Sequence, residues 1–473
     1  MDGRIVIVRP DGSGAPALLD DPQRLRFRQP LTPAEAARLS LRPLYEPEPG
    51  ELDDRCGWYG DSGDWVLLTQ VPDSSFGEPM VLVGAGEAVL RAYPVAPGRF
   101  VRGDGAELDL VCDEAGGPAL RIGGGPGTAM LARDERYRER PITFRAGPDD
   151  LAATLVTPAG PGPHPAAVIL HGAAGGQRDF CRLLVQPALD AGVAVLLYDR
   201  RGTGRSTGTP EFTIFDQATA AEAALDRIAA EPDVDADRLG LIAFSNGGWS
   251  APMVAARRDL AFLVGIGVPG VSMAESELHR RTRVLRDSGV GPETVDAAGE
   301  AWRCVFALAS AGRPEEAVTT RLAAALDRLR SAADLDRYVV PDYARANPML
   351  SAVPPLAPVD ELVPMLVGEA DPELGHDPVE DYARVRCPTL HQWGGADTNV
   401  PARLSRERIA AALPDPAVAT LREYPEAEHL LNVAPSGVQG ISAEEAGNGF
   451  HRFRFAPGVR DDLRDWLSAV TSR

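Results

Sequence analysis

One stretch, Leu239–Pro252, constrains this chain more than any other. An apolar run ends at Phe244, directly before Ser245, and small residues lie two positions on either side of the serine, at Ala243 and Gly247. An alanine-rich segment that can form a helix comes next. A strand, a serine between small residues and a helix are the parts of a nucleophile elbow, a turn so tight that bulky neighbours would collide. The pattern predicts that the serine hydroxyl stands clear of the sheet, with the next backbone N–H groups pointing at the same spot.

Composition limits the partners that the chain can have. It has 473 residues, 44% hydrophobic and 25% charged, which suits two domains or one large decorated domain. The formal net charge of −20 argues against nucleic acid or an anionic membrane as a partner, since like charges repel. All 48 basic residues are arginine. The lack of lysine excludes a lysine Schiff base and a Walker-type phosphate loop.

The cysteines and the first residues favour a cytoplasmic protein. Five cysteines are scattered, none with the spacing of metal ligands, at Cys56, Cys112, Cys181, Cys304 and Cys387. An odd number without such spacing predicts reduced thiols. The first residues lack the long apolar run and cleavage site of a signal peptide. No apolar run approaches the ~18 residues of a membrane helix, so no membrane partner is expected.

Residues 1–135 read as a small, mainly antiparallel β-rich domain. Short apolar or alternating runs are separated by Gly, Pro and Asp clusters, as is typical of such sheets. The runs are Arg4–Val8, Trp65–Gln70, Pro79–Val83, Ala88–Tyr93, Leu108–Cys112 and Ala119–Ile122. A helix start is expected at Thr32, and the glycine-rich run Gly123–Gly127 is interpreted as a turn rather than a phosphate cradle. No catalytic constellation is found here.

Residues 136–473 alternate between strand and helix patterns after an expected hairpin of Pro141–Arg145 and Leu151–Thr157. Such alternation implies a mostly parallel sheet with helices on both faces, an α/β fold. The expected strands are Ala166–Leu170, Val193–Tyr198, Leu239–Ala243, Phe262–Gly267, Pro388–Trp393 and Ala417–Tyr424. The expected helices are Asp179–Ala191, Thr213–Ala230, Gly248–Arg258, Ala402–Leu413 and Gly458–Val470.

A helical insertion interrupts this alternation at about residues 272–371. Three helical stretches are expected there, Ser272–Ser288, Pro292–Ala311 and Pro314–Ala333, followed by a proline-rich segment. An inserted helical block in a sheet enzyme usually caps the carboxyl ends of the strands, so we expect a helical cap that shapes the substrate pocket. The alternative is a structural excursion away from the site.

The sequence His171-Gly172-Ala173 directly follows an expected strand. The backbone N–H of Ala173, with that of Asn246, is expected to form an oxyanion hole, which stabilises the charge that develops on a carbonyl oxygen. His171 itself is interpreted as structural, because its place belongs to the loop that positions the backbone. The arginine- and glycine-rich loop Asp199–Gly208 could be interpreted as a phosphate-binding site. We favour the interpretation that it is a packed loop whose charges pair locally.

Two residues near the end of the chain complete a catalytic set. His429 follows the last expected strand and is the natural general base, because its pKa lies near neutrality. Asp397, in a glycine-rich loop, is expected to orient this imidazole. Glu426 and Glu428 are also acidic, but adjacency in sequence is poor geometry for that role. The remaining histidines compete less well, and His391 is expected in the core.

The order Ser245, Asp397, His429 (nucleophile, acid, base) is that of the α/β-hydrolase fold. Residues from about 140 to 473 resemble an α/β-hydrolase of the esterase and prolyl-oligopeptidase-like group, which includes dienelactone-hydrolase-like enzymes. The motifs that carry the resemblance are Val168–Gly172, Leu197–Ser206, Phe244–Trp249, Gly395–Pro401 and Pro425–His429. A β domain before the catalytic domain is also familiar in such bacterial hydrolases.

The resemblance implies Ser245 as nucleophile, Asp397 as acid and His429 as base, with Ala173 and Asn246 as oxyanion donors. The substrate pocket is expected to include His171, Gly172 and Trp249. The leading hypothesis is a serine hydrolase of a small-molecule carboxylic ester or thioester, which acts through an acyl-enzyme and needs no metal or organic cofactor.

Three other functions stay open on the same residues. One is a peptidase or amidase, and another is an acyltransferase or cyclase of specialised metabolism. The third is a non-catalytic protein of this fold that binds a small molecule. The sequence leaves the oligomeric state open, with a homodimer as one option.

Overall fold

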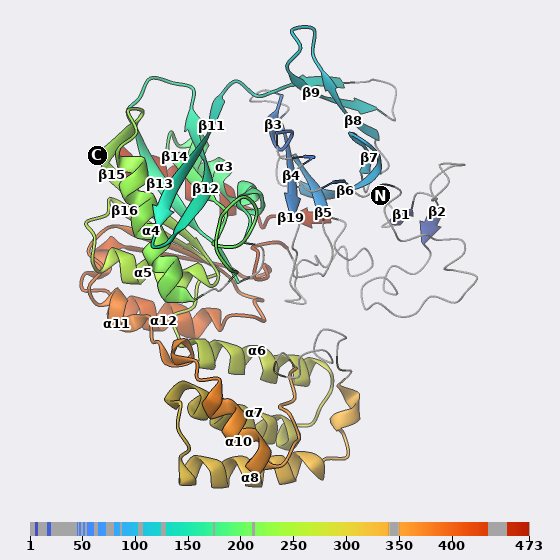
Figure 1. The fold of residues 1–473 in the computed structure, drawn as a ribbon, viewed down its shortest axis with the longest axis vertical. Coiled ribbons are helices and arrows are strands. Elements are labelled where there is room, and N and C mark those ends of the chain that lie inside the picture. Colours follow the sequence, from blue (N-terminus) through green and yellow to red (C-terminus); the bar gives the residue numbers. More distant parts are fainter. Residues whose placement is uncertain are drawn as a thin grey trace.

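The computed structural model gives the described part of the chain two many-stranded sheets, a separate pair of strands and a group of helices apart from them (Figure 1). It describes residues 5–7, 17–19, 45, 47–48, 51–52, 54–60, 65–71, 80–85, 88–102, 107–123, 129–173, 176–210, 213–338, 340, 349, 351–433 and 452–472. Within these ranges, none of the helices has the length and apolar character needed to cross a membrane.

The sheet that contains the longest strands, which we call the large sheet, has eight strands in the order β11-β12-β14-β13-β15-β16-β17-β18. Its strands are β11 (Tyr137–Ala146), β12 (Asp149–Pro158), β13 (His164–Leu170), β14 (Ala194–Tyr198), β15 (Val234–Phe244), β16 (Phe262–Ile266), β17 (Thr389–Gly394) and β18 (Ala419–Tyr424). β11 and β12 form an antiparallel hairpin, and β12 runs antiparallel to β14. The neighbours from β14 to β18 are parallel, so their carboxyl ends share one edge.

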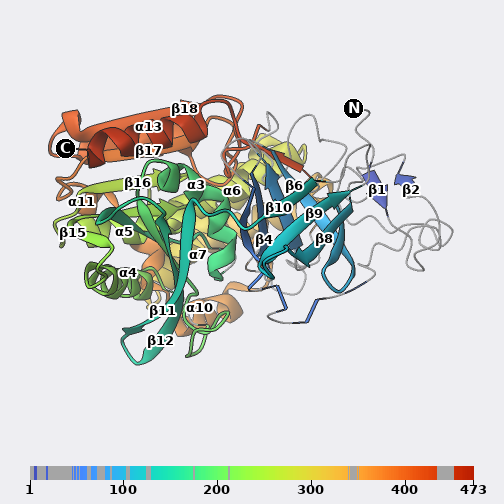
Figure 2. The ribbon, with the colours of Figure 1, turned by 90° about the horizontal axis from the view of Figure 1, so that it is seen from above.

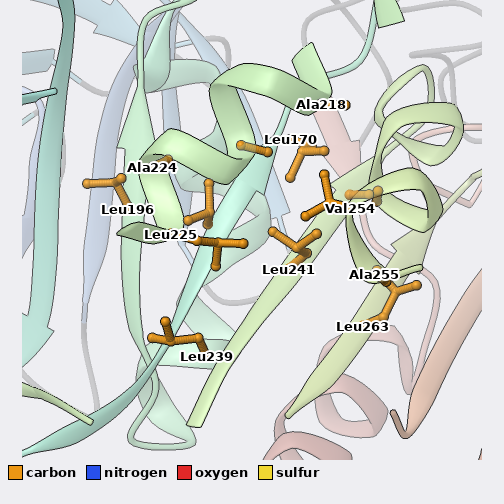
Figure 3. Packing of buried hydrophobic residues seen from close by; sticks show 14 of the residues in the cluster. Leu170, Leu196, Ala218, Ala224, Leu225, Leu239, Leu241, Val254, Ala255 and Leu263 are labelled. Carbon is orange, nitrogen blue, oxygen red and sulfur yellow. The ribbon is translucent and has the colours of Figure 1, made fainter. Parts of the chain in front are cut away.

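The central strands are mostly apolar where both faces of the sheet are covered. In β13, Ala166, Val168 and Leu170 belong to one hydrophobic cluster, whereas Ala167 and Ile169 belong to another. Side chains alternate between the two faces of a strand, so a strand buried on both sides needs a continuous apolar run. Figure 3 shows the first of these clusters packed between the sheet and its helices.

Two groups of helices cover the two faces. α4 (Ile214–Ala229), α5 (Gly247–Ala255) and α12 (Ala402–Ala412) contribute to the cluster that contains Leu170. α3 (Arg182–Asp190) and α13 (Val459–Thr471) contribute to the cluster that contains Ile169. Figure 2 shows α4 and α13 on opposite sides of the sheet. A short helix, α11 (Val379–Tyr382), precedes β17.

A second sheet, of nine mostly shorter strands, is antiparallel and lies mostly in the first part of the chain. Its path runs from β3 to β10 through β3 (Gly57–Tyr59), β4 (Val66–Val71), β5 (Met80–Ala85), β6 (Ala88–Ala96), β7 (Arg99–Arg102), β8 (Glu107–Cys112), β9 (Pro118–Gly123) and β10 (Ala129–Ala132). β19 (Arg452–Arg454), from near the carboxyl terminus, pairs with β6. A separate pair is formed by β1 (Ile5–Ile7) and β2 (Ala17–Leu19).

The helical insertion between β16 and β17 has a hydrophobic cluster of its own. Its helices are α6 (Met273–Asp287), α7 (Pro292–Ala311), α8 (Glu316–Arg330) and α10 (Val359–Gly368). Ser272 caps α6, and its side chain and that of Glu275 form a reciprocal capping box. In Figure 1, α7, α8 and α10 stand apart from the large sheet, with α6 between them and α12.

These elements confirm the predicted α/β-hydrolase architecture and the N-terminal antiparallel sheet. Sequence reading missed β3, β7, β10 and β19, which are only three or four residues long, and it missed α10 inside the proline-rich segment. The helix start expected at Thr32 lies outside the described residues, as does most of Gly123–Gly127. The domain boundary near residue 135 and the capping role of the insertion stay predictions.

Candidate active site

Ser245 sits in a strained turn between β15 and α5. Its φ is 49°, in the left-handed region that residues with a Cβ rarely adopt. Its backbone N–H donates to the carbonyl of Ile266 at 3.0 Å, which ties the turn to β16. A Cβ added to Gly247 would lie 2.9 Å from the Leu170 side chain and carbonyl, so only glycine fits there. The elbow is therefore built as the small residues predict.

A line of hydrogen bonds runs from the serine to a buried acid. The hydroxyl of Ser245 is 2.8 Å from Nε2 of His429, and Nδ1 of His429 is 2.8 Å from Oδ2 of Asp397. The other oxygen of Asp397 accepts the backbone N–H groups of Asn399 at 2.7 Å and Val400 at 3.0 Å. The acid is thus fixed by its own loop, and the three residues from distant parts of the chain form one set.

Loops at the carboxyl edge of the sheet bring these side chains together. Asp397 follows β17 and His429 follows β18, which is parallel to β17. Gly394 allows the two loops to touch, since a Cβ there would lie 2.3 Å from the carbonyl oxygens of Ala427 and Glu428. The backbone N–H of Glu428 donates to the carbonyl of Asn432 at 2.9 Å, which closes the turn that presents His429.

Charge and burial set the protonation of His429. Burial lowers the pKa of the imidazole, but the adjacent Asp397 carboxylate raises it more, by charge and by hydrogen bond, so the net pKa is above the ordinary histidine value. The neighbouring Glu428 is fully buried, and burial raises its pKa to about 8. Glu428 Oε1 accepts the N–H groups of Leu430 and Asn432, so this carboxyl supports the turn.

The loop expected to supply one oxyanion donor lies beside the serine at Gly172. Gly172 is so close that a Cβ built on it would lie 3.3 Å from the Ser245 Cβ. Asn246, the next residue after the serine, precedes the first turn of α5, where backbone N–H groups have no partner within the helix. Among the described residues, neither the Ala173 nor the Asn246 N–H donates a hydrogen bond.

The other expected pocket residues are buried. His171 packs edge-to-face on Tyr198, with ring centroids 4.8 Å apart. Burial, and secondarily the charge of Arg200, lowers the pKa of His171 to about 3, which keeps its ring neutral. The Trp249 indole lies inside the cluster under α5 and donates to the Val271 carbonyl at 2.8 Å. Trp249 thereby ties α5 to the start of the insertion.

Two further sequence interpretations are confirmed. His391 is fully buried in β17 and stacks on Trp393, with ring centroids 5.5 Å apart, so it is a core residue. In the loop after β14, Asp199 pairs with Arg178 at 2.9 Å and accepts the backbone N–H of Arg205 at 3.0 Å. The charges of this loop do pair locally.

His279, on α6, is a residue that sequence reading passed over. Its Nε2 is buried without a hydrogen-bond partner in the described part of the chain. Burial lowers its pKa, while the charge of Asp397 raises it, so the ring is within electrostatic reach of the candidate site. The Ser276 hydroxyl, one turn earlier on α6, donates to the Asn399 carbonyl at 3.3 Å. A helical pattern alone cannot tell which face of α6 meets that loop.

Metal ligands do not gather here. Across the ranges that the structure describes, there is no cluster of three or more His, Cys, Asp or Glu side chains placed to hold a metal ion.

Comparison with known proteins agrees with the fold. Residues 167–438 match the model of the alpha/beta hydrolase family. No curated protein matches closely enough to count as a relative.

Among solved structures, a proline iminopeptidase from Mycobacterium smegmatis is 17% identical over 70% of this chain and 99% of its own, with a TM-score of 0.41. Est1E from Butyrivibrio proteoclasticus, with ferulic acid bound, is 16% identical over 70% and 100%, with a TM-score of 0.39. A thermophilic esterase from Thermogutta terrifontis is 19% identical over 71% and 99%, with a TM-score of 0.37. Sequence and structural similarity this low does not indicate which substrate this chain binds.

Proposed function

Because the chain belongs to the alpha/beta hydrolase family, we propose that it is a serine hydrolase that cleaves a carboxylic ester or thioester. The observation that carries the proposal is the hydrogen-bonded line from Ser245 through His429 to Asp397, with 2.8 Å at each step. A serine hydroxyl is a weak nucleophile, and a hydrogen-bonded base that is itself oriented by an acid is the arrangement that activates it.

In the acylation step, His429 Nε2 takes the proton of Ser245 as its oxygen attacks the substrate carbonyl. The carbonyl π electrons move onto the oxygen, and the resulting oxyanion accepts hydrogen bonds from the N–H groups of Ala173 and Asn246. When the tetrahedral intermediate collapses, the bond to the leaving group breaks and His429 returns the proton to it. Asp397 stays ionised throughout and stabilises the imidazolium.

In the deacylation step, water replaces the serine as the nucleophile. His429 takes a proton from the water, the hydroxide adds to the acyl carbon, and collapse releases the carboxylic acid and restores the Ser245 hydroxyl. The triad needs no metal or organic cofactor for either step. We also propose a cytoplasmic enzyme with a small-molecule acyl substrate, which is supported by five free cysteines, four of them buried.

The test is hydrolysis of p-nitrophenyl esters, from acetate to octanoate, and of an acyl thioester. The wild-type protein is expected to hydrolyse at least one of them, and His429→Gln to lose that activity while it unfolds at the same temperature. The rate should fall on the acid side with a midpoint above the ordinary histidine value of about 6.5, since His429 must be neutral to act as base.

The rival activities give different outcomes in the same experiment. Cleavage of aminoacyl p-nitroanilides in preference to esters would favour a peptidase or amidase. Consumption of a thioester only when an amine or alcohol is present would favour an acyltransferase or cyclase, since water would then be a poor acceptor. Binding of esters without turnover would contradict catalysis by this site.

A further inference from the structure

Two side chains outside the triad hold the backbone of the oxyanion loop, which we define as His171–Ala173. Gln217, on α4, donates from Nε2 to the His171 carbonyl at 3.0 Å. Arg200, which follows β14, donates from Nη1 to the Gly172 carbonyl and from Nη2 to the Ala173 carbonyl, both at 3.2 Å. All three carbonyl oxygens of this short loop are therefore bound by side chains from other elements.

The planarity of the peptide bond gives these contacts a consequence for catalysis. The carbonyl of Gly172 and the N–H of Ala173 belong to one planar trans unit, in which they point in opposite directions. When Arg200 binds the Gly172 oxygen, the Ala173 N–H is held pointing away from Arg200. That N–H is the donor assigned to the oxyanion. A hydrogen bond to the carbonyl also polarises the same peptide unit, which strengthens its N–H as a donor.

Gln217 and the backbone of Arg200 have further hydrogen-bond partners. The Ser250 hydroxyl lies 2.8 Å from both Oε1 of Gln217 and the Ile214 carbonyl oxygen, which share its one proton, while Nε2 of Gln217 donates to His171. Ser250 belongs to α5, the helix that follows the second oxyanion donor, Asn246. The backbone N–H of Arg200 donates to the Gly176 carbonyl at 2.7 Å. Gln217 thus links the His171 carbonyl to α5, the helix that begins after Asn246.

We propose that Arg200 and Gln217 are positioning residues that align the Ala173 N–H with the developing oxyanion. This inference rests on the proposed function, because it assigns a role only if Ser245 performs acyl transfer. Neither residue exchanges a proton or touches the reacting atoms. Their effect is to lower the free energy of the tetrahedral state without changing how tightly the ground-state substrate binds.

A cavity beside these residues makes the inference testable by chemical rescue. It has a volume of about 80 Å³ and is lined by residues that include Arg200, Gln217, Tyr198 and Leu151. If Arg200 is shortened to alanine, a free guanidinium ion can enter from this side. Guanidinium offers the same fork of N–H donors to the two carbonyls that Arg200 now binds.

The experiment measures kcat and KM for p-nitrophenyl acetate in wild type and in Arg200→Ala, Arg200→Lys and Gln217→Met. Arg200→Ala and Gln217→Met are expected to lower kcat by about 10- to 100-fold, less than the loss from deleting an oxyanion donor, with KM little changed. Arg200→Lys should fall between Arg200→Ala and wild type. Millimolar guanidinium should restore kcat to Arg200→Ala and leave wild type unaffected.

Affinity for a trifluoromethyl ketone supplies a readout that a purely structural role would not move. Its serine adduct carries an oxyanion, so its affinity should fall by the same factor as kcat/KM in each variant. The matched control is Arg201→Gln, in the same loop, because Arg201 pairs with Asp149 at 2.6 Å instead of binding the oxyanion loop. This control should keep wild-type kcat.

Two results would overturn the inference. One is a kcat of Arg200→Ala and Gln217→Met equal to that of Arg201→Gln. The other is a fall in kcat with no loss of ketone affinity and no guanidinium rescue. If Arg200→Ala does not fold, Gln217→Met decides the question alone. A wild-type protein that hydrolyses no ester and forms no ketone adduct would instead contradict the proposed function.

Discussion

The carboxyl edge of the large sheet and the helical insertion after β16 differ in what fixes their side chains. At the sheet edge, each residue of the proposed triad lies in a loop or turn that follows a strand, and backbone hydrogen bonds hold that loop or turn in place. Asp397, for example, accepts two backbone N–H groups from the loop that carries it. In the insertion, the apolar side chains face one another in a separate cluster, and polar contacts link α6 to the Asp397 loop and to α12.

This difference suggests that the strand ends carry the catalytic residues and that the insertion sets the substrate preference. A strand end is placed by the sheet, whose register is fixed over many residues, so a triad there tolerates little variation. A helical unit with its own core can shift or change its inner surface without disturbing the strands. We therefore expect changes at the strand ends to abolish turnover, and changes in the insertion to alter stability or substrate size preference.

The largest effect is expected for Asp397→Asn. The amide keeps the size of the side chain but presents no carboxylate to His429 Nδ1, so kcat should fall by about 10⁴-fold. Turnover of p-nitrophenyl acetate measures this. The matched control is Glu426→Gln, an exposed acid three residues before the base, which should keep wild-type kcat. Equal losses in the two variants would make the choice of Asp397 wrong.

The independence of the insertion is tested by Leu322→Ala. Leu322 is fully buried in the insertion's own cluster, so the cavity left behind should cost about 2–5 kcal/mol. Hydrogen exchange should quicken in α7 and α8 but not in β15 or β17, and acetate turnover should persist. Leu225→Ala, in the cluster beside the sheet, is the comparison that should quicken exchange in the strands too. Loss of strand protection in Leu322→Ala would contradict a separate core.

A smaller effect is expected for Glu428→Gln at the sheet edge. The folded-state pKa of Glu428, about 8, lies above its ordinary value, so the folded protein holds a proton that the unfolded chain has released. This contribution to stability is present at low pH and is lost as pH rises from about 4.5 towards 8. Urea unfolding should therefore show Glu428→Gln gaining stability over wild type between these limits. If the difference in unfolding free energy between Glu428→Gln and wild type does not change with pH across that range, the assignment of a buried, protonated carboxyl is wrong.

The smallest effect is expected for Ser276→Ala, at the contact between α6 and the Asp397 loop. Loss of its hydrogen bond to Asn399 should cost about 0.5–1.5 kcal/mol and change KM for long-chain esters more than for acetate. Ser288→Ala is the control, because its hydroxyl, at the end of α6, donates to the Val284 carbonyl of the same helix. If Ser276→Ala changes KM equally for the acetate and octanoate esters, the insertion does not select substrates by chain length.

The sequence can predict the features that depend on local patterns. Ser245, Asp397 and His429 are identifiable because each follows a segment with a strand pattern, and parallel strands end at one edge. The hairpin β11–β12 was expected from its turn, and α7 runs over the expected residues. These features are local, so the sequence pattern contains them.

The features that were missed depend on contacts between distant segments. β19 exists only because it pairs with β6, more than 350 residues earlier in the chain. Arg200 and Gln217 were overlooked as partners of the oxyanion loop, because a loop arginine and a buried glutamine on α4 have no characteristic spacing from His171. His279 likewise gains its position from the way α6 packs on the Asp397 loop.

The most direct measurement is the intact mass of the protein after reaction with a fluorophosphonate, which phosphonylates an activated serine. The wild-type protein should gain one equivalent of probe, and Ser245→Ala should gain none while unfolding at the wild-type temperature. A Ser245→Ala protein that takes up the probe as readily as wild type would contradict the proposal that this serine is the nucleophile.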